Sequence, residues 1–293
     1  MAFDLVIRGG TVVDGSGLGG QRADVGVKDG LITRVGRIRE FGRQEIDATG
    51  HVVTPGFIDG HTHMDAQVFW DALGTNSCWH GVTTVVMGHC GFTLAPASSK
   101  ARQLVIANLE RAEDISPKAL AEGVEWTWET FAEYLDAVDR APKGINYVAN
   151  IGHSALRTYV MGERAFVSRA SEADVRAMSD HLRDALRAGA WGFTTSRSSS
   201  HQTSDNRPVA SRLASWGEVI ELVGVMGALG TGIFQITEDH PTPNTQADYN
   251  RRIIELGVTT GVPIIVGATR GAAVLDLLDE AADAGANVFG LTH

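Results

Sequence analysis

The spacing of apolar and polar residues changes near residue 54. Before that point, short apolar stretches alternate with glycine-rich turns, which is typical of small antiparallel β structure. An Asp29-Gly30 pair between two such stretches predicts a tight hairpin. The sequence predicts a small all-β unit over residues 1–54, with strands at residues 3–13 (broken by a Gly9-Gly10 turn), Ala23–Val27, Leu31–Val35, Glu45–Ala48 and His51–Thr54.

After residue 54 the pattern becomes strand and helix in alternation. The predicted strands are the one leading into His61, then Gly81–Met87, Ile145–Ile151, Ala190–Thr195, Gly232–Thr237, Val262–Val266 and Asn287–Leu291. The predicted helices cover residues 99–112, 127–140, 171–188, 215–229, 246–260 and 271–284, the third of them capped by Ser171. About seven strands separated by helices indicate a parallel sheet. We therefore expect a (β/α)8 barrel over residues 55–293 that is incomplete at its C-terminus. An open doubly wound sheet is the alternative, but the Gly-x-Gly-x-x-Gly turn typical of that fold is missing after the first strand.

Composition narrows the class of partner and the location. The 293 residues carry a net charge of −10, which argues against nucleic acid or an anionic membrane as a partner. The chain has neither an apolar stretch of membrane-spanning length nor, in residues 1–10, the features of a signal peptide. Two cysteines make no disulfide framework. We expect a cytoplasmic globular protein.

A His-x-His pair, His61 and His63, follows the apolar residues Val53–Ile58. In an extended strand the side chains of residues i and i+2 point to the same side, so the two imidazoles are expected to bind one metal ion. Cys90 ends the next predicted strand and is expected to lie beside them as a thiolate ligand. Two ordinary polar residues and a small buried cysteine are the alternative interpretation.

Further candidates also fall near strand ends. His153 follows the third strand and is a candidate to stabilise an oxyanion, although a structural histidine is equally compatible with its position. Asp65 is a candidate to orient a ligand or a substrate amine, and Arg197 and His201, in the loop after the fourth strand, are candidates to bind substrate. We expect His89 to point away from the metal ligands and Cys78 to pack in the core.

Taken together, these motifs resemble the N-acyl-D-amino-acid deacylase (D-aminoacylase) family of the amidohydrolase superfamily. The matching segments are Asp4–Gly15, Val53–His63, Gly81–Val86, Cys90–Phe92, Gly152–Arg157 and Gly192–Ser196. The resemblance implies a (β/α)8 barrel joined to a small β-sandwich built from both ends of the chain. It also implies a zinc centre whose ligands here are His61, His63 and Cys90.

The sequence departs from the family pattern at several positions. Thr237 and Ala268 stand where the family has histidines at the ends of strands five and six, so one zinc ion is favoured over two. The loop from Thr195 to Val209 is divergent. The family's catalytic aspartate follows a later strand, so we expect the general base to lie beyond this chain, which looks truncated. Glu238 and Asp239 are the internal strand-end carboxylates.

Three functional hypotheses follow. The first is a metal-dependent hydrolase that cleaves the C–N bond of a linear amide, such as a small N-acyl amino acid, with a metal-activated water. The second is a truncated, catalytically silent homologue that acts in binding or assembly, with exposed strand edges that favour oligomers. The third is a cyclic-amide hydrolase of the dihydroorotase or hydantoinase kind, which is less favoured because Ala190–Arg197 lacks the lysine usual on strand four.

Overall fold

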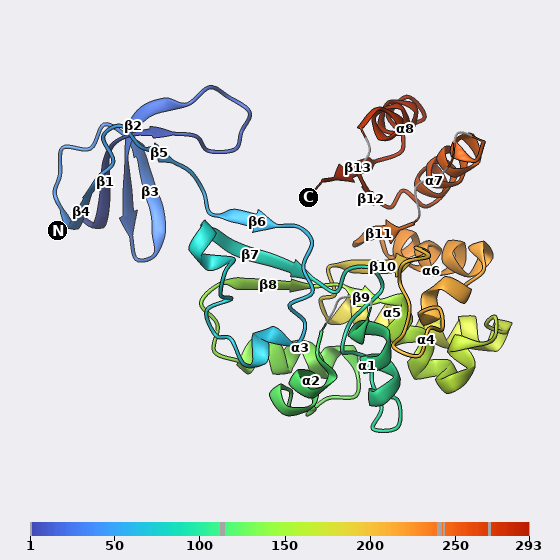
Figure 1. Ribbon diagram of the computed structural model, residues 1–293. Helices are drawn as coiled ribbons and strands as arrows, with labels where there is room; N and C mark the ends of the chain where they lie inside the picture. The colour runs from blue at the N-terminus through green and yellow to red at the C-terminus, as the bar shows by residue number, and fades with distance from the viewer. Residues whose placement is uncertain (1, 112–114, 239–241, 243, 269–270, 293) are drawn as a thin grey trace. The chain divides into compact units, whose positions relative to one another are not determined.

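The protein consists of two compact units, Met1–Phe57 and Ile58–His293 (Figure 1). The computed structural model describes residues 2–111, 115–238, 242, 244–268 and 271–292. The sequence predicts a domain boundary at residue 54, and in the structure the first unit ends at Phe57.

The first unit is a five-stranded sheet with the order β3-β2-β1-β4, in which β5 also pairs with β1. β2 is antiparallel to both β1 and β3, whereas β4 and β5 run parallel to β1. Asp29 and Gly30, between β2 and β3, have φ angles of 51° and 76°, which are typical of the predicted tight hairpin turn. The strands are β1 (Phe3–Val12), β2 (Gln21–Lys28), β3 (Leu31–Gly36), β4 (Gly42–Asp47) and β5 (Val52–Val53).

The predicted turn at Gly9-Gly10 is wrong. β1 continues through both glycines, and its register against β2 shifts between Ile7 and Gly10, so the pair forms a bulge. Gly9 has a φ of 66°, and a Cβ on Gly10 would lie 2.6 Å from a methyl group of Val53. Hydrogen bonds to strands on both sides keep β1 extended, so the glycines relieve a local distortion and do not reverse the chain.

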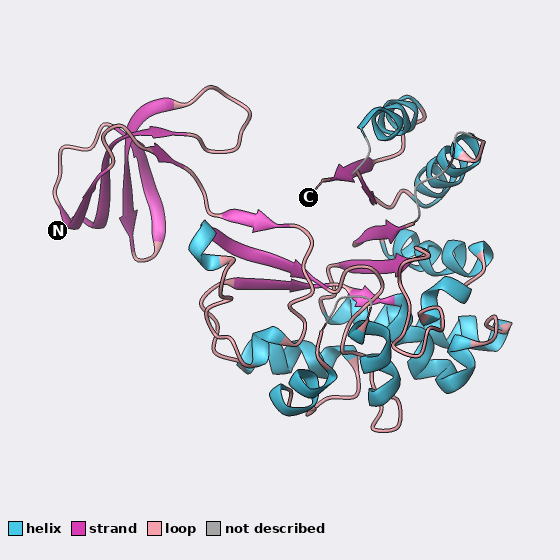
Figure 2. Cartoon of the chain, in the orientation of Figure 1, coloured by secondary structure: helices cyan, strands magenta, loops and turns pink. Residues whose placement is uncertain are grey.

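In the second unit, strands alternate with helices, and the strand pairings whose registers are known are parallel (Figure 2). β6, β7 and β8 form one sheet, and β9 to β13 form another in sequence order. The strands are β6 (Phe57–Asp59), β7 (Val82–Met87), β8 (Asn146–Ala149), β9 (Ile151–Gly152), β10 (Gly192–Ser196), β11 (Ile233–Thr237), β12 (Ile264–Gly267) and β13 (Val288–Leu291).

The third predicted strand is interrupted at Asn150, which separates β8 from β9. The backbone N–H of Asn150 donates to Met87 of β7, and Trp191, just before β10, donates to Ala149. This interrupted strand therefore links the two sheets. With β8 and β9 taken as one, the described residues contain the seven parallel segments that were predicted. The pairings between them form two sheets and do not close a barrel.

The helices pack against these strands around one main core that includes Met87, Ile151, Phe193 and Phe234. The helices are α1 (Arg102–Glu110), α2 (Pro117–Gly123), α3 (Phe131–Arg140), α4 (His153–Met161), α5 (Glu172–Ala188), α6 (Trp216–Leu229), α7 (Gln246–Thr260) and α8 (Gly271–Asp283). Ser171 caps α5 in a reciprocal capping box with Asp174, so that predicted cap is confirmed. Among the residues described, no helix combines the length and apolar character needed to cross a membrane.

Two helices, α2 and α4, were not predicted. Most of α4 is buried, including the polar residues His153, Ser154, Arg157 and Thr158. A helix with polar residues on its buried side lacks the apolar stripe that identifies an amphipathic helix in a sequence.

Candidate metal centre

The second unit brings His61, His63 and Cys90 together. One ligand atom from each residue lies within 4.8 Å of the other two, and within the described part of the chain these are the residues that form such a group. His61 Nε2 is 3.4 Å from Cys90 Sγ, and the two imidazole rings are 5.4 Å apart. The predicted ligands thus converge at the carboxyl ends of β6 and β7.

Pairing with β7 positions the two histidines. They follow β6, and Thr62 between them donates both its backbone N–H and its hydroxyl to the Val86 carbonyl oxygen, each at 2.9 Å. This anchors the buried Thr62 towards β7. His61 and His63 then project to the opposite side, as the alternation of an extended segment predicts.

A left-handed turn positions Cys90. Gly88, Cys90 and Gly91 have φ angles of 81°, 55° and 79°. The Cys90 N–H donates to Gln235 Oε1 at 3.1 Å, and the Gly91 N–H donates to Thr194 Oγ1 at 3.0 Å. Side chains from β11 and β10 therefore hold the turn that ends β7.

The donor set fits a zinc ion. Two imidazole nitrogens and one thiol sulfur are ligands that zinc prefers, and three protein ligands leave a coordination position open, as in catalytic zinc sites. Burial, together with the neighbouring His61, His89 and His201, lowers the pKa of His63 well below its usual 6.5. His63 is therefore neutral at pH 7, which is the form that binds metal.

The prediction that His89 points away from the ligands is wrong. Its ring stacks on that of His61, with the centroids 4.2 Å apart and the planes at 21°. Burial and the neighbouring His61 lower its pKa to about 3. The prediction assumed that the chain is extended up to Cys90, but the left-handed residues Gly88 and Cys90 break the alternation of sides.

Asp65 lies deep in the protein, with 1% of its surface exposed. Its Oδ2 accepts the Gly88 N–H at 3.0 Å, and its Oδ1 has no hydrogen-bond partner among the described residues. Burial raises its pKa to about 7. Its contact with Gly88 favours a role in supporting the Cys90 turn over contact with substrate.

His153 belongs to a different, fully buried polar cluster. Its Nδ1 is 2.8 Å from Thr195 Oγ1, and its Nε2 is 2.9 Å from Glu218 Oε1. Arg157 Nη1 donates to both oxygens of Glu218, at 2.5 and 2.6 Å. Burial lowers the pKa of His153 although Glu218 opposes the shift, so the ring is neutral at pH 7. With both nitrogens engaged within the protein, this geometry favours the structural interpretation of His153 over oxyanion stabilisation.

The two predicted substrate-binding residues lie in the loop after β10. His201 Nδ1 is 2.6 Å from Ser196 Oγ, and its ring contacts Phe92, which in turn contacts His63. Arg197 Nη1 donates to the Ala214 carbonyl oxygen at 3.0 Å, and its Nε pairs with Glu238 at 3.4 Å. His201 thus lies near His63, with Phe92 in contact with both rings, and Arg197 is held by an acidic partner.

Two residues at the site escaped the sequence analysis as functional candidates: Gln235 and Thr194. Gln235 and Thr194 lie in strands that are buried and mainly apolar. A polar residue in such a strand was the signal in the sequence that could have identified them. Thr237, which stands where the family has a histidine, has its hydroxyl oxygen 3.3 Å from Cys90 Sγ. Ala268 follows β12, while Asp239 and His240 lie outside the described residues.

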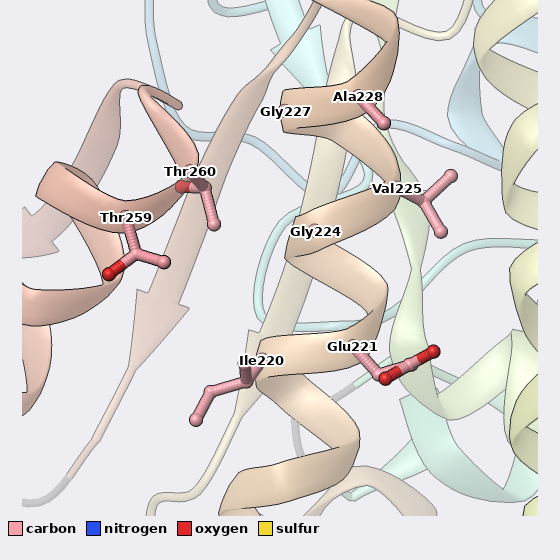
Figure 3. Close-up of a pocket in the computed structure, with 8 residues that line it drawn as sticks. All are labelled: Ile220, Glu221, Gly224, Val225, Gly227, Ala228, Thr259 and Thr260. Atoms are coloured by element: carbon pink, nitrogen blue, oxygen red, sulfur yellow. The ribbon is translucent and has the colours of Figure 1, made fainter.

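A separate groove lies along α6, from Ile220 to Ala228, beside the C-terminal end of α7 (Figure 3). Small side chains dominate it, and it contains none of the predicted site residues. In a β/α repeat the C-terminal ends of the helices lead into the amino ends of the next strands, opposite the carboxyl ends near which His61, His63 and Cys90 lie. Its lining is Ile220, Glu221, Gly224, Val225, Gly227, Ala228, Thr259 and Thr260.

Comparison with known proteins places this site in a family. Residues 44–217 match the model of the amidohydrolase family. The D-aminoacylase of Alcaligenes xylosoxydans xylosoxydans is 37% identical over 233 residues, which cover 79% of this chain and 43% of that protein. A D-aminoacylase structure described for its binuclear metal centre superimposes with a TM-score of 0.79 at 31% identity, covering 99% of this chain and 58% of that one.

A second structure, the N-acyl-D-glutamate deacylase of Bordetella bronchiseptica with zinc and a phosphonate inhibitor, gives a TM-score of 0.74 at 27% identity. It too is matched over 99% of this chain and 58% of its own length. The chain thus spans about half the length of the relatives it matches. By sequence and by fold, it belongs to the amidohydrolase family.

Proposed function

We propose that this chain carries the metal-binding part of a zinc-dependent hydrolase that cleaves the amide bond of small N-acyl-D-amino acids. The observation that carries the proposal is the convergence of His61, His63 and Cys90 at the carboxyl ends of neighbouring strands. Relatives named as deacylases of N-acyl-D-amino acids support the substrate class.

In this proposal some residues bind the metal and others bind the substrate. His61, His63 and Cys90 hold the ion. When bound, zinc polarises the scissile carbonyl and activates the attacking water. His201, whose ring contacts Phe92, and Arg197 bind the polar end of the substrate. One ion is favoured, because Thr237 and Ala268 supply no imidazole at the ends of β11 and β12.

The chain covers 43% of a related D-aminoacylase, and we assign no general base among the described residues. Glu238, the described carboxylate after β11, is paired with Arg197 and is a poor general base while it stays so.

The other hypotheses have less support. The match to a D-aminoacylase covers most of the chain and favours linear amides over cyclic ones. A catalytically silent homologue would not need three zinc-type ligands close together. The net charge of −10 still disfavours nucleic acid, and a cytoplasmic location stays a prediction.

The test is the zinc content of protein purified without added metal, measured by atomic absorption for the wild type and for His61→Ala/His63→Ala. We expect about one zinc per chain in the wild type and none in the variant. His51→Ala, at an exposed histidine of the first unit, is the matched control and retains zinc. Well-folded wild type without zinc would overturn the proposal. Release of the free amino acid from N-acyl-D-amino acids then tests activity.

A further inference from the structure

Two side chains of β11, Gln235 and Thr237, contact Cys90. Gln235 is 4% exposed; its Oε1 accepts the Cys90 backbone N–H at 3.1 Å, and its Nε2 donates to Thr237 Oγ1 at 2.8 Å. A backbone N–H can only donate, so it fixes which end of the amide is the oxygen. The NH2 end must therefore face Thr237.

The direction of the next hydrogen bond follows from this one. The Thr237 oxygen accepts from Gln235 and lies 3.3 Å from Cys90 Sγ. A metal-bound cysteine is a thiolate, which can only accept, so the Thr237 hydroxyl donates its proton to the sulfur. Gln235, Thr237 and Cys90 thus form a continuous chain of hydrogen bonds that ends on a metal ligand.

We propose that Gln235 and Thr237 are positioning residues of the metal centre, the first holding the Cys90 backbone and the second its sulfur. The proposal rests on the metal binding argued above and goes beyond it, because it assigns a role to residues that do not ligate.

The backbone of Cys90 needs such support. Its φ of 55° is a left-handed conformation that costs a non-glycine residue energy and persists only where surrounding contacts hold it. Without Gln235, the Cys90 N–H would be buried with no acceptor in its place, and the turn would relax. Any relaxation moves Sγ away from the two imidazoles.

The role of Thr237 is electronic as well as geometric. A hydrogen bond withdraws electron density from a thiolate and so raises the energy of charge transfer from sulfur to a bound metal. Valine has nearly the shape of threonine and lacks the hydroxyl, so Thr237→Val removes this bond with little change in packing. Serine keeps the hydroxyl.

The experiment uses Co²⁺ as a spectroscopic substitute for zinc. We titrate Co²⁺ into metal-free wild type, Thr237→Val, Thr237→Ser and Gln235→Leu, and record the sulfur-to-cobalt charge-transfer band and the Kd. Thr158→Val, which removes a buried hydroxyl on α4, controls for the loss of a threonine hydroxyl elsewhere in the fold. Circular dichroism of each metal-free variant checks that it is folded.

We expect Thr237→Val to shift the band to longer wavelength and to raise the Kd about tenfold, with Thr237→Ser and Thr158→Val unchanged. We expect Gln235→Leu to raise the Kd by about 10- to 100-fold, the usual cost of removing a residue that orients a ligand. A folded Thr237→Val with the wild-type band and Kd overturns the inference while leaving the metal site intact. Wild type that binds no Co²⁺ overturns the proposed function and the inference with it.

Discussion

Two groups of polar residues in the second unit, one around His153 and one around His61 and His63, have opposite surroundings. His153 lies between Thr195 and the Glu218–Arg157 ion pair, so both of its nitrogens are bonded within the fold. His61, His63 and His89 instead surround one another beside Cys90, and the pKa of His63 is lowered by burial and by other imidazoles. The first group is a completed network that contributes to the fold. The second group places metal-binding atoms close together, and a bound ion would offset the energetic cost of that arrangement.

This difference teaches how to interpret a histidine at a strand end. His153 and His61 both follow predicted strands, so position at a strand end alone does not distinguish their roles. The carboxylate and guanidinium around His153 favour a structural role for it, whereas the thiol beside His61 favours the proposed role as a metal ligand. The following predictions test that contrast.

The largest effect is expected in the ion-pair network. Arg157→Met leaves Glu218 buried with only a neutral imidazole as partner, which should lower the free energy of unfolding by about 3–5 kcal/mol. Urea denaturation measures this loss. Arg183→Met, which breaks an exposed pair with Asp180, is the control and should cost at most about 1 kcal/mol. Folded Arg157→Met should still bind one zinc per chain. Loss of zinc would show that the ion-pair network also supports the metal site.

Zinc should stabilise the protein against unfolding only through the second group of residues. At a free zinc concentration 100 times the Kd, we expect wild type to gain about 2.7 kcal/mol against unfolding. His63→Ala should gain nothing, and Thr195→Val should gain as much as the wild type. Urea denaturation with buffered zinc and with chelator provides the comparison. Equal stabilisation of His63→Ala would place the zinc elsewhere.

A smaller effect is expected where His153 meets β10. Thr195→Val removes the donor to Nδ1 and leaves a buried nitrogen unsatisfied, which should cost about 1–3 kcal/mol. The metal-free variant and wild type are compared by urea denaturation at pH 7. A loss confined to zinc-loaded protein would instead assign Thr195 to the metal centre.

The smallest effect is a pH dependence at Asp65. Its folded-state pKa is raised from 3.8 to about 7, so between these values the folded protein holds a proton that the unfolded chain has released. This group therefore makes the wild type less stable as pH rises from about 4 to 7. Asp65→Asn removes that loss while keeping an acceptor for the Gly88 N–H.

Relative to the wild type, metal-free Asp65→Asn should gain about 1 kcal/mol per pH unit near pH 5.5. Urea denaturation at pH 5 and pH 6 measures the slope. Asp71→Asn is the contrast: hydrogen bonds, chiefly from Thr75, lower the pKa of Asp71 to about 2, so no gain is expected above pH 5. Parallel slopes for Asp65→Asn and the wild type would show that Asp65 is ionised in the fold.

The sequence predicted much of this arrangement because its signals are local. The β/α alternation, the Ser171 cap and the Asp29-Gly30 turn depend on neighbouring residues, and so does the same-side projection of His61 and His63. The Gly9-Gly10 bulge and the side on which His89 lies depend on strands paired from elsewhere. Gln235 is 145 residues from the cysteine it supports, and no local pattern encodes that contact.

The left-handed conformation of Cys90 also limits how this site can change over evolution. Among residues with a side chain, asparagine, aspartate and histidine are the ones enriched at positive φ. Asparagine would keep the turn and abolish a soft ligand, whereas aspartate would keep the turn and supply a hard oxygen donor in its place. A single substitution at residue 90 therefore offers a route from the proposed zinc site to one that favours metals such as manganese, without rebuilding the strand that precedes it.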